Sequence, residues 1–464
     1  MSVTINDVSW TWPNGEQVLD EIALNPVPGT LTLVCGASGS GKSTLVRLIN
    51  GLIPHFHDGQ LTGTVLVGDQ EVADTPVDQM GRLTATVFQN PATQFFTTTV
   101  ADELAFAGQN HQVPADEIRR RRTEALETLG IEELADRDLR GLSGGQLQKV
   151  ACAQALAQDA PIILLDEPTS NLDPEAIDAI REAIARLKQL GRTLVVAEHR
   201  IYFLRDLVDE AVIMADGRIT SRMSGEEFFA MDDAERRNLG LRTLERPEWM
   251  GQIIDVPACR THQDPAPESS GDADGSDASG LVVSDLTVER GGHTILDIDR
   301  LVFPRGTITG IIGANGIGKT TLARTICRLQ RARRGIRVTV NGHALVRGQA
   351  FLVMQDVHRQ LFAESVADEA SEPQLARLDL ASLTSRHPLS LSGGQKQRLV
   401  IATAIDQEAR VLILDEPTSG VDHRHLLSIA AELRTLADDD RVVIVVSHDA
   451  EFLNECADRI IRLT

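Results

Sequence analysis

Two segments of the sequence combine glycines, a lysine and a hydroxyl residue in the order that a phosphate-binding loop requires. They read GASGSGKS and GANGIGKT. In such a loop glycine allows a sharp turn and brings backbone N–H groups close to phosphates, while the following helix adds the positive end of its dipole. The lysine is expected to neutralise the β and γ phosphates, and the last hydroxyl to ligate Mg²⁺. The predicted phosphate-binding residues are Gly36, Ser38, Gly39, Gly41, Lys42, Ser43 and Thr44, and Gly313, Asn315, Gly316, Gly318, Lys319, Thr320 and Thr321.

An acidic pair follows a four-residue apolar run at two places. Asp166 and Glu167 follow IILL, and Asp415 and Glu416 follow VLIL. Such a run is typical of a strand that is buried on both faces. The aspartate at the end of the strand is a candidate Mg²⁺ ligand. The glutamate is a candidate general base that polarises an attacking water.

Three further motifs recur in the same order in both halves of the chain: a glutamine, the pentapeptide LSGGQ and a histidine. LSGGQ offers a hydroxyl, two glycine amides and a helix start, which again suit a phosphate. The residues concerned are Gln89, Ser143, Gly144, Gly145, Gln146 and His199, and Gln355, Ser392, Gly393, Gly394, Gln395 and His448. The last residue of LSGGQ precedes the aspartate by 20 positions in both halves, and the glutamate precedes the histidine by 32. A repeat this long indicates two copies of a whole domain.

The elements that position these motifs follow from the pattern of apolar runs. Strands are predicted at Thr30–Val34, Ile162–Leu165 and Thr193–Ala197, with counterparts at Val411–Leu414 and Val442–Val446. Alternation with helical segments predicts an α/β fold with a doubly wound parallel sheet, whose ligands bind at the carboxyl ends of the strands. The second copy is 28 residues shorter between its lysine and LSGGQ, which we expect to shorten peripheral elements.

Composition places the domain boundary between the two copies. Residues 262–280 are small, acidic and turn-forming, so they cannot contribute a core. We predict a first domain at 1–250, a flexible acidic linker at 251–280 and a second domain at 281–464.

Bulk properties exclude several classes of function. The net charge of −22 disfavours nucleic acid as a partner. No signal peptide or run of about 18 apolar residues occurs, so any transport path must lie in other subunits. The five scattered cysteines fit reduced thiols better than a disulfide framework or a zinc site.

Taken together, the motifs resemble those of ATP-binding-cassette (ABC) ATPases, and the resemblance covers nearly the whole chain outside the linker. It implies two tandem P-loop domains, each with a RecA-like parallel-sheet core, a small antiparallel β subdomain and a helical subdomain. It further implies ATP and Mg²⁺ as ligands and an intramolecular head-to-tail dimer with two composite sites, both of which hydrolyse ATP. The first site would combine Lys42, Gln89, Glu167 and His199 with Ser392–Gln395, and the second Lys319, Gln355, Glu416 and His448 with Ser143–Gln146.

The resemblance also assigns individual roles. Catalytic roles fall on the glutamates, the switch histidines and the glutamines, and adenine stacking falls on Trp12. The second half has Glu289 or Arg290 in the place of Trp12, which puts its adenine contact in doubt. The implied Mg²⁺ ligands are Ser43, Gln89 and Asp166, and Thr320, Gln355 and Asp415.

The segment after each glutamine distinguishes kinds of cassette protein. QNPATQFF and QDVHRQLF both contain Q-x4-Q and an apolar pair, followed by VADE at the same offset. This pattern resembles the fused ATPase subunits of energy-coupling-factor (ECF) transporters, importers of vitamins and transition-metal ions. The implied partners are transmembrane (T-type) and substrate-binding (S-type) membrane subunits. The implied location is the cytoplasmic face of the membrane.

Two alternatives remain open at this point. Tandem cassettes also occur in ABC-F ribosome factors and in other importers, and VSHDAEFL around His448 resembles the ABC-F phrase. However, ABC-F proteins join their halves through a long charged helix, whereas this linker is acidic and loop-forming. Sugar-importer fusions usually carry one degraded site, whereas both sets of motifs are complete here.

Overall fold

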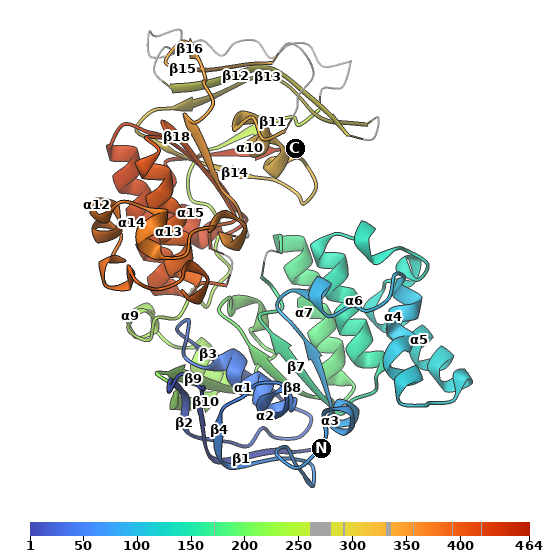
Figure 1. The fold of residues 1–464 in the computed structure, drawn as a ribbon. Helices are drawn as coiled ribbons and strands as arrows, with labels where there is room; N and C mark the ends of the chain where they lie inside the picture. Colours follow the sequence, from blue (N-terminus) through green and yellow to red (C-terminus); the bar gives the residue numbers. More distant parts are fainter. Residues whose placement is uncertain are drawn as a thin grey trace. The chain divides into compact units, whose positions relative to one another are not determined.

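The computed structural model describes residues 1–170, 172–259, 280–290, 293–330, 336–355, 357–391, 393–418 and 420–464. The chain divides into two compact units, Met1–Arg246 with Asp422–Arg424, and Pro247–Val421 with His425–Thr464. The two are called the first and the second unit below (Figure 1). Among the described residues, no helix is both long enough and apolar enough to cross a membrane.

The first unit is built on a six-stranded sheet in the order β10-β9-β3-β8-β7-β6, parallel except for β10. The strands are β3 (Leu31–Gly36), β6 (Thr84–Val87), β7 (Ile162–Asp166), β8 (Thr193–Ala197), β9 (Glu210–Ala215) and β10 (Arg218–Ser224). The apolar runs before the acidic pair and before His199 therefore form the predicted parallel strands. Successive residues of β7 enter opposite cores, since Ile163 packs in one hydrophobic cluster and Ile162 in the other.

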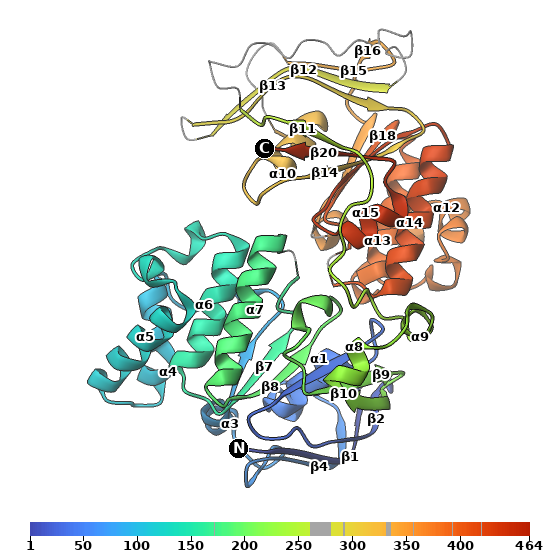
Figure 2. The same ribbon diagram turned by 180° about the vertical axis from the view of Figure 1, so that it is seen from behind.

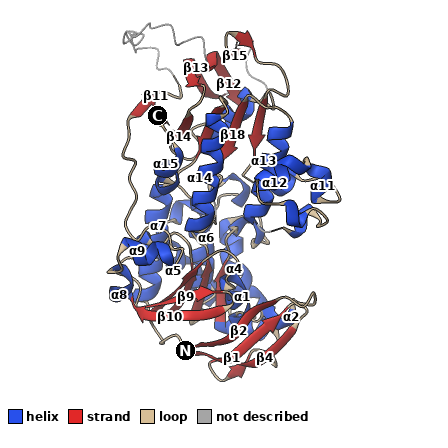
Figure 3. Ribbon diagram, turned by 90° about the vertical axis from the view of Figure 1, so that its left-hand side faces the viewer, coloured by secondary structure: helices blue, strands red, loops and turns tan. Residues whose placement is uncertain are grey.

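A second, antiparallel sheet in the order β2-β1-β4-β5 completes this unit. It consists of β1 (Val3–Thr11), β2 (Gln17–Leu24), β4 (Gln60–Val67) and β5 (Gln70–Glu71). Helix α1 (Lys42–Ile49) packs between the two sheets, because Leu45 and Leu48 share one cluster with Val8 of β1 and Val195 of β8 (Figure 3). The other helices are α2 (Leu52–His55), α3 (Val77–Leu83), α4 (Val100–Asn110), α5 (Ala115–Leu129), α6 (Gly144–Ala157), α7 (Pro174–Gln189), α8 (Gly225–Phe229) and α9 (Asp233–Asn238).

The second unit repeats this plan. Its parallel sheet has the order β11-β20-β14-β19-β18-β17, and its antiparallel sheet the order β13-β12-β15-β16. The strands are β11 (Ile253–Val256), β12 (Gly280–Arg290), β13 (His293–Pro304), β14 (Ile308–Ile312), β15 (Arg337–Val340), β16 (His343–Ala344), β17 (Ala350–Val353), β18 (Val411–Asp415), β19 (Val442–Val446) and β20 (Arg459–Leu463). The two units thus confirm the predicted α/β fold with tandem P-loop cores.

The helical part of the second unit is reduced, as its shorter sequence predicts. Helices α11 and α12 have 4 and 6 residues, whereas α4 and α5 at the same places in the first unit have 11 and 15. The helices of this unit are α10 (Lys319–Ile326), α11 (Val366–Glu369), α12 (Glu372–Arg377), α13 (Gly393–Asp406), α14 (His423–Asp438) and α15 (Ala450–Cys456).

The start of the predicted linker is not a linker. Residues Ile253–Val256 form β11, which pairs in parallel with β20 at the edge of the six-stranded sheet of the second unit (Figure 2). The pairing continues beyond the strand, where the N–H of Ala258 donates to the carbonyl of Thr464 at 2.8 Å. Trp249 packs against the second unit's core. The prediction that 251–259 belong to a flexible segment was therefore wrong, and residues 260–279 lie outside the described residues.

We expect β11 to stabilise the second unit. Replacing residues 253–256 by Gly-Ser-Gly-Ser removes apolar packing and edge pairing, and should cost roughly 1–3 kcal/mol of the unit's unfolding free energy. Calorimetry of the full chain should show an unfolding transition for each unit, and that of the second unit should shift to lower temperature. The same replacement at residues 268–271, within the predicted linker, is the control and should shift neither transition. An unshifted melt of the β11 variant would show that the strand adds no stability.

Candidate functional site

Each phosphate loop connects a central strand to the helix that follows it. Gly36, at the end of β3, has φ 140° and lies so close to β9 that an added Cβ would be 2.0 Å from the carbonyl oxygen of Met214. Gly313 after β14 has φ 146°, and its Cβ would lie 2.6 Å from the carbonyl oxygen of Leu463. Glycine is required at both positions because neither the dihedral angle nor the space admits a side chain.

The lysine, hydroxyl and aspartate of the motifs meet in both units. Lys42 Nζ donates to the carbonyl oxygens of Gly36 (3.1 Å) and Ala37 (2.9 Å), inside the curve of the loop. Ser43 Oγ donates to Asp166 Oδ1 at 2.8 Å. The second unit matches: Lys319 Nζ donates to the carbonyls of Gly313 (2.7 Å) and Ala314 (3.0 Å), and Thr320 Oγ1 to Asp415 Oδ2 (2.8 Å).

These groups fit a nucleotide and its magnesium ion. The hydroxyls of Ser38 and Ser40 are buried in the first loop without a hydrogen-bond partner among the described residues, so the loop holds polar atoms ready for phosphate oxygens. The hydroxyl of Ser43 and the carboxylate of Asp166 supply two of the oxygen ligands that Mg²⁺ prefers, and phosphates and water supply the rest.

Both candidate bases have an unusual backbone conformation. Glu167 has φ 49° and Glu416 has φ 50°, in the left-handed region that residues with a side chain rarely adopt. In each unit the N–H of the glutamate donates at 2.8 Å to the carbonyl of the last residue of the neighbouring strand, Ala197 in β8 or Val446 in β19. This backbone conformation is present in both copies, and such outliers concentrate at functional sites.

The side chains around Glu167 come from its own turn and from two other segments. Gln89 Nε2 donates to Glu167 Oε2 at 2.8 Å, and Ser170 Oγ donates to the same oxygen at 3.2 Å. His199 Nε2 lies 3.5 Å from Glu167 Oε1. The structure thus brings together glutamine, glutamate and histidine as the sequence predicts, and adds Ser170, which sequence reasoning missed.

In the second unit, the histidine and the serine before it approach the glutamate. His448 Nε2 lies 3.8 Å from Glu416 Oε1 and 3.2 Å from Asn315 Oδ1 of the phosphate loop. Ser447 Oγ donates to Glu416 Oε2 at 3.4 Å. Gln355 is exposed just after β17. The histidine of this unit is therefore linked to its own phosphate loop through Asn315.

Burial changes the protonation of these groups. Burial, with the neighbouring Asp166, raises the pKa of Glu167 to about 7. Burial also raises the pKa of Asp166 and of Asp415, each against a hydrogen bond from its serine or threonine partner. The pKa of Lys42 is lowered by burial. A carboxyl group with a pKa near 7 can accept a proton at neutral pH, as a general base must.

A buried glutamate that was not among the predicted site residues lies next to the first histidine. Glu198 accepts a hydrogen bond from Thr169 Oγ1, and burial raises its pKa to about 8. The second unit has Ser447 at this position, and Thr418 Oγ1 donates instead to Asp449 Oδ2 at 2.9 Å. The buried acceptor therefore precedes the histidine in the segment VVAEH and follows it in the segment VVSHD.

Glu198→Gln should stabilise the chain at alkaline pH. The folded state keeps the Glu198 proton up to about pH 8, whereas the unfolded state loses it near pH 4.5, so wild-type stability falls as pH rises through this window. The amide cannot ionise and still accepts from Thr169. Urea unfolding should show a gain of about 1–3 kcal/mol at pH 8 and almost none at pH 5. Glu226→Gln, at an exposed position of the same unit, is the control. Equal gains at both pH values would contradict the assignment.

The first LSGGQ motif begins a helix through a capping box. Ser143 Oγ accepts from the N–H of Gln146 at 3.3 Å, and Gln146 Oε1 accepts from the N–H of Ser143 at 3.0 Å. An added Cβ on Gly145 would lie 2.6 Å from Ala176 Cβ of α7, so glycine allows α6 and α7 to pack closely. In the second unit α13 begins at Gly393, and Ser392 lies outside the described residues. Whether each motif faces the other unit's phosphate loop stays a prediction.

The predicted adenine-stacking residue follows the end of β1. Trp12 is half-buried, and its ring meets that of His57 edge to face, with centroids 5.6 Å apart and planes at 84°. It also meets Trp10 edge to face at 5.4 Å. His57 is a neighbour that sequence reasoning missed. In the second unit the strand has an irregularity between Val288 and Glu289, and Glu289 pairs with Thr294 instead of presenting a ring.

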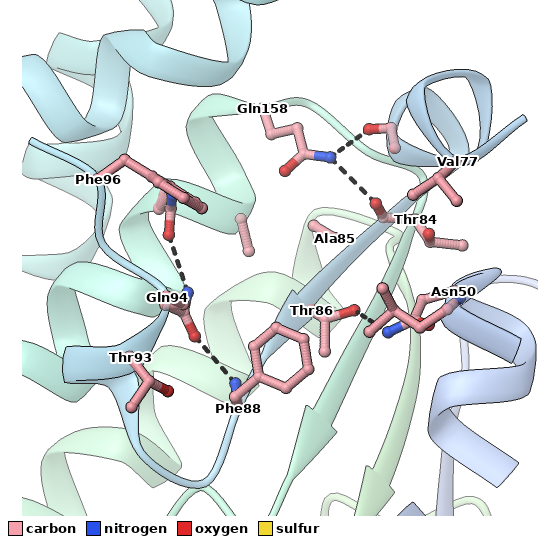
Figure 4. Close-up of a pocket in the computed structure, with 14 residues that line it drawn as sticks. Asn50, Val77, Thr84, Ala85, Thr86, Phe88, Thr93, Gln94, Phe96 and Gln158 are labelled. Carbon is pink, nitrogen blue, oxygen red and sulfur yellow. Dashed lines mark hydrogen bonds between the residues drawn. The ribbon is translucent and has the colours of Figure 1, made fainter. Parts of the chain in front are cut away.

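A cavity of about 470 Å³ lies beside β6, the strand that precedes Gln89 (Figure 4). Its wall includes Phe88, Gln94, Phe96 and Gln154. Gln94 Oε1 accepts from the N–H of Phe88 at 3.0 Å, which fixes the turn between the two glutamines of Q-x4-Q. The cavity is therefore lined in part by the Q-x4-Q segment and the apolar pair that follows it.

Known proteins resemble this chain along its whole length. The ABC transporter family model matches residues 19–170 and 296–419. An ABC transporter ATP-binding protein of Treponema denticola is 36% identical, covering 100% of this chain and 95% of that protein. A Bacillus subtilis protein named for HMP/thiamine import, YkoD, is 29% identical over 99% and 88%. A solved archaeal ribosome recycling factor, aABCE1, shares the fold at 20% identity and a TM-score of 0.60, covering 98% of this chain and 87% of that one.

Proposed function

Because this chain belongs to the ABC transporter family of ATP-hydrolysing proteins, we propose that it is the ATPase subunit of an ECF-type importer. It would couple ATP binding and hydrolysis at two head-to-tail composite sites to the uptake of a vitamin or a transition-metal ion. The observation that carries the proposal is the exposed phenylalanine that follows Q-x4-Q in each unit, Phe96 in the first and Phe362 in the second. The name of the relative YkoD, which refers to HMP/thiamine import, supports an import role.

Both units present a phenylalanine to solvent at the same place in the motif. Phe96 is 75% exposed and Phe362 is 84% exposed. Phe96 stacks on Phe106, with ring centroids 5.2 Å apart and planes at 14°, whereas Phe95 packs partly buried against the core. Exposed aromatic rings beside a cavity are typical of a protein docking site. We infer that this surface receives a cytoplasmic helix of a T-type membrane subunit.

The residues at each site suit hydrolysis. Lys42 would bind the β and γ phosphates, and Ser43 with Asp166 would hold Mg²⁺, which would neutralise charge on the phosphates when bound. Glu167 accepts a proton from the attacking water, while His199 and Gln89 orient its carboxylate. By the repeat of the motifs, we assign the corresponding roles in the second unit to Lys319, Thr320, Asp415, Glu416, His448 and Gln355.

Membrane association tests the docking surface. In fractionated cells, tagged wild-type chain should sediment largely with membranes. The double variant Phe96→Ser/Phe362→Ser should shift to the supernatant, since losing a central aromatic contact typically costs about 2 kcal/mol or more, or about thirtyfold in affinity. Val27→Ser/Leu329→Ser removes two other exposed apolar side chains and is the control. Unchanged sedimentation of the phenylalanine variant would contradict this docking site.

A further inference from the structure

A chain of hydrogen-bonded polar side chains, partly or fully buried, runs from the residues that follow β6, just before Gln89, to the helix that begins at LSGGQ. The N–H of Phe88 donates to Gln94 Oε1 at 3.0 Å, and Gln94 Nε2 donates to Gln154 Oε1 at 2.9 Å. Gln154 lies on α6, and its Nε2 donates to Glu103 Oε1 at 2.8 Å. Each link has one donor and one acceptor, so the backbone N–H at one end fixes the orientation of both amides.

The same chain ends at the turn that presents Phe96. Glu103 is fully buried, and its second oxygen accepts from the N–H groups of Phe96 (3.0 Å) and Thr97 (2.9 Å) and from the hydroxyl of Thr97 (2.8 Å). A carboxylate is the acceptor that suits four donors at once, and hydrogen bonds to it are roughly twice as strong as neutral ones. Glu103 therefore fixes the position of the exposed ring.

The second unit keeps both ends of this chain and lacks the middle. Gln360 Oε1 accepts from the N–H of Met354 at 2.7 Å, and Glu369 Oε1 accepts from the N–H of Phe362. However, Gln360 Nε2 donates to the carbonyl of Leu352 instead. The position that corresponds to Gln154, eight residues after LSGGQ, is occupied by a threonine in this unit.

That threonine is too short to continue the chain. Thr403 Oγ1 donates to the backbone carbonyls of Glu369 (3.2 Å) and Leu399 (3.1 Å). The hydrogen bonds of Gln360 and Thr403 therefore do not continue from the turn after Gln355 to the carboxylate that holds Phe362.

We propose that Gln154 is a positioning residue that links the Gln89 strand end and the LSGGQ helix to the Phe96 surface, and that the second unit lacks this link. Gln89 contacts Glu167 at 2.8 Å, so a movement of Gln89 when ATP binds passes through Phe88 and Gln94 to Gln154 and on to the turn at Phe96. Binding of ATP to the first unit then changes the surface around Phe96 more than binding of ATP to the second unit changes the surface around Phe362. This inference rests on the proposed function only in naming that surface as the docking site.

Hydrogen exchange on the full chain tests the link without a partner. Amide exchange is measured for the peptides covering 94–99 and 360–365, with and without a non-hydrolysable ATP analogue and Mg²⁺. In wild type, nucleotide should change the exchange rate at Phe96 and Thr97 by about fivefold or more, the lower end of usual coupling, and the 360–365 peptide by less. Gln154→Met keeps the side-chain volume and removes the hydrogen bonds, so the nucleotide effect at 94–99 should fall below about twofold.

Gln158→Met is the matched control. Gln158 is the C-cap residue of α6, four positions after Gln154. It lines the same cavity and donates to the carbonyl oxygen of Thr84 at 3.0 Å, but it is not part of the hydrogen-bond chain. It should keep the wild-type nucleotide effect, and both variants should keep the basal ATPase kcat.

Three results would overturn the inference. These are no nucleotide effect at 94–99 in wild type, a retained effect in Gln154→Met, or an equal loss in Gln158→Met, which would indicate general loosening of α6. The membrane-association assay is independent of these outcomes, so failure of the docking proposal would be distinguishable from failure of the link.

Discussion

Glu167→Gln and Glu416→Gln should each lower the steady-state rate of ATP hydrolysis by at least half, and the double variant should lower it by about 100-fold or more. The amide has the shape of the carboxylate but cannot accept a proton from water, and general-base catalysis typically contributes about 10²–10⁴-fold. The rate is measured as phosphate release at saturating ATP and Mg²⁺. The strained backbone at both glutamates, φ 49° and 50°, is the structural reason for expecting two active sites.

Nucleotide binding is the control for these variants. Equilibrium dialysis should show that each glutamine variant still binds ATP, since Lys42 and Lys319 are unchanged. If either single variant kept the full wild-type rate, the chain would have one hydrolytic site and the prediction of two would fail.

Gly36→Ala should unfold or strongly destabilise the first unit. The new Cβ would lie 2.0 Å from the carbonyl oxygen of Met214, a backbone atom of the adjacent strand, so the loop or β9 must move. We expect a loss of about 3 kcal/mol or more in unfolding free energy, beyond the range of ordinary substitutions. Chemical unfolding measures the stability, and ATP binding by the first unit should fall with it because the loop is displaced.

Gly39→Ala is the matched control within the same loop. Gly39 also has a positive φ, 80°, but no atom lies within 4 Å of an added Cβ. Only the backbone strain remains, which costs about 1–2 kcal/mol. Equal losses for the two variants would show that strain, and not the approach of β9, makes Gly36 necessary.

Motifs with fixed spacing could be placed from the sequence because their chemistry depends on neighbouring residues. Ser43 meets Asp166 and Thr320 meets Asp415, each at 2.8 Å, because a loop and a strand end occupy the same edge of a parallel sheet. The four-residue apolar runs similarly predicted β7 and β18 to within one residue.

Features that depend on pairing between distant segments could not be predicted. The sequence of β11 was assigned to the linker because the strand has only four residues and lies shortly before the acidic stretch. Its partner β20 lies at the other end of the domain. Thr169 donates to Glu198, the residue before the first histidine, whereas Thr418 donates to Asp449, the residue after the second histidine. The sequence alone does not indicate which carboxylate accepts the hydrogen bond. Nothing in the sequence distinguishes Gln154 from other polar residues of its helix, because its hydrogen bonds join it to residues about 50 to 60 positions away.

Co-purification is the most direct test of the central claim that this chain drives a membrane importer. The chain is tagged in its native host, extracted in mild detergent, and the eluted proteins and small molecules are identified by mass spectrometry. We expect stoichiometric hydrophobic membrane proteins, retained by wild type and lost with Phe96→Ser/Phe362→Ser, together with a bound vitamin or metal ion. Ribosomal subunits, with no membrane protein, would contradict it and assign the chain to the ribosome-acting class.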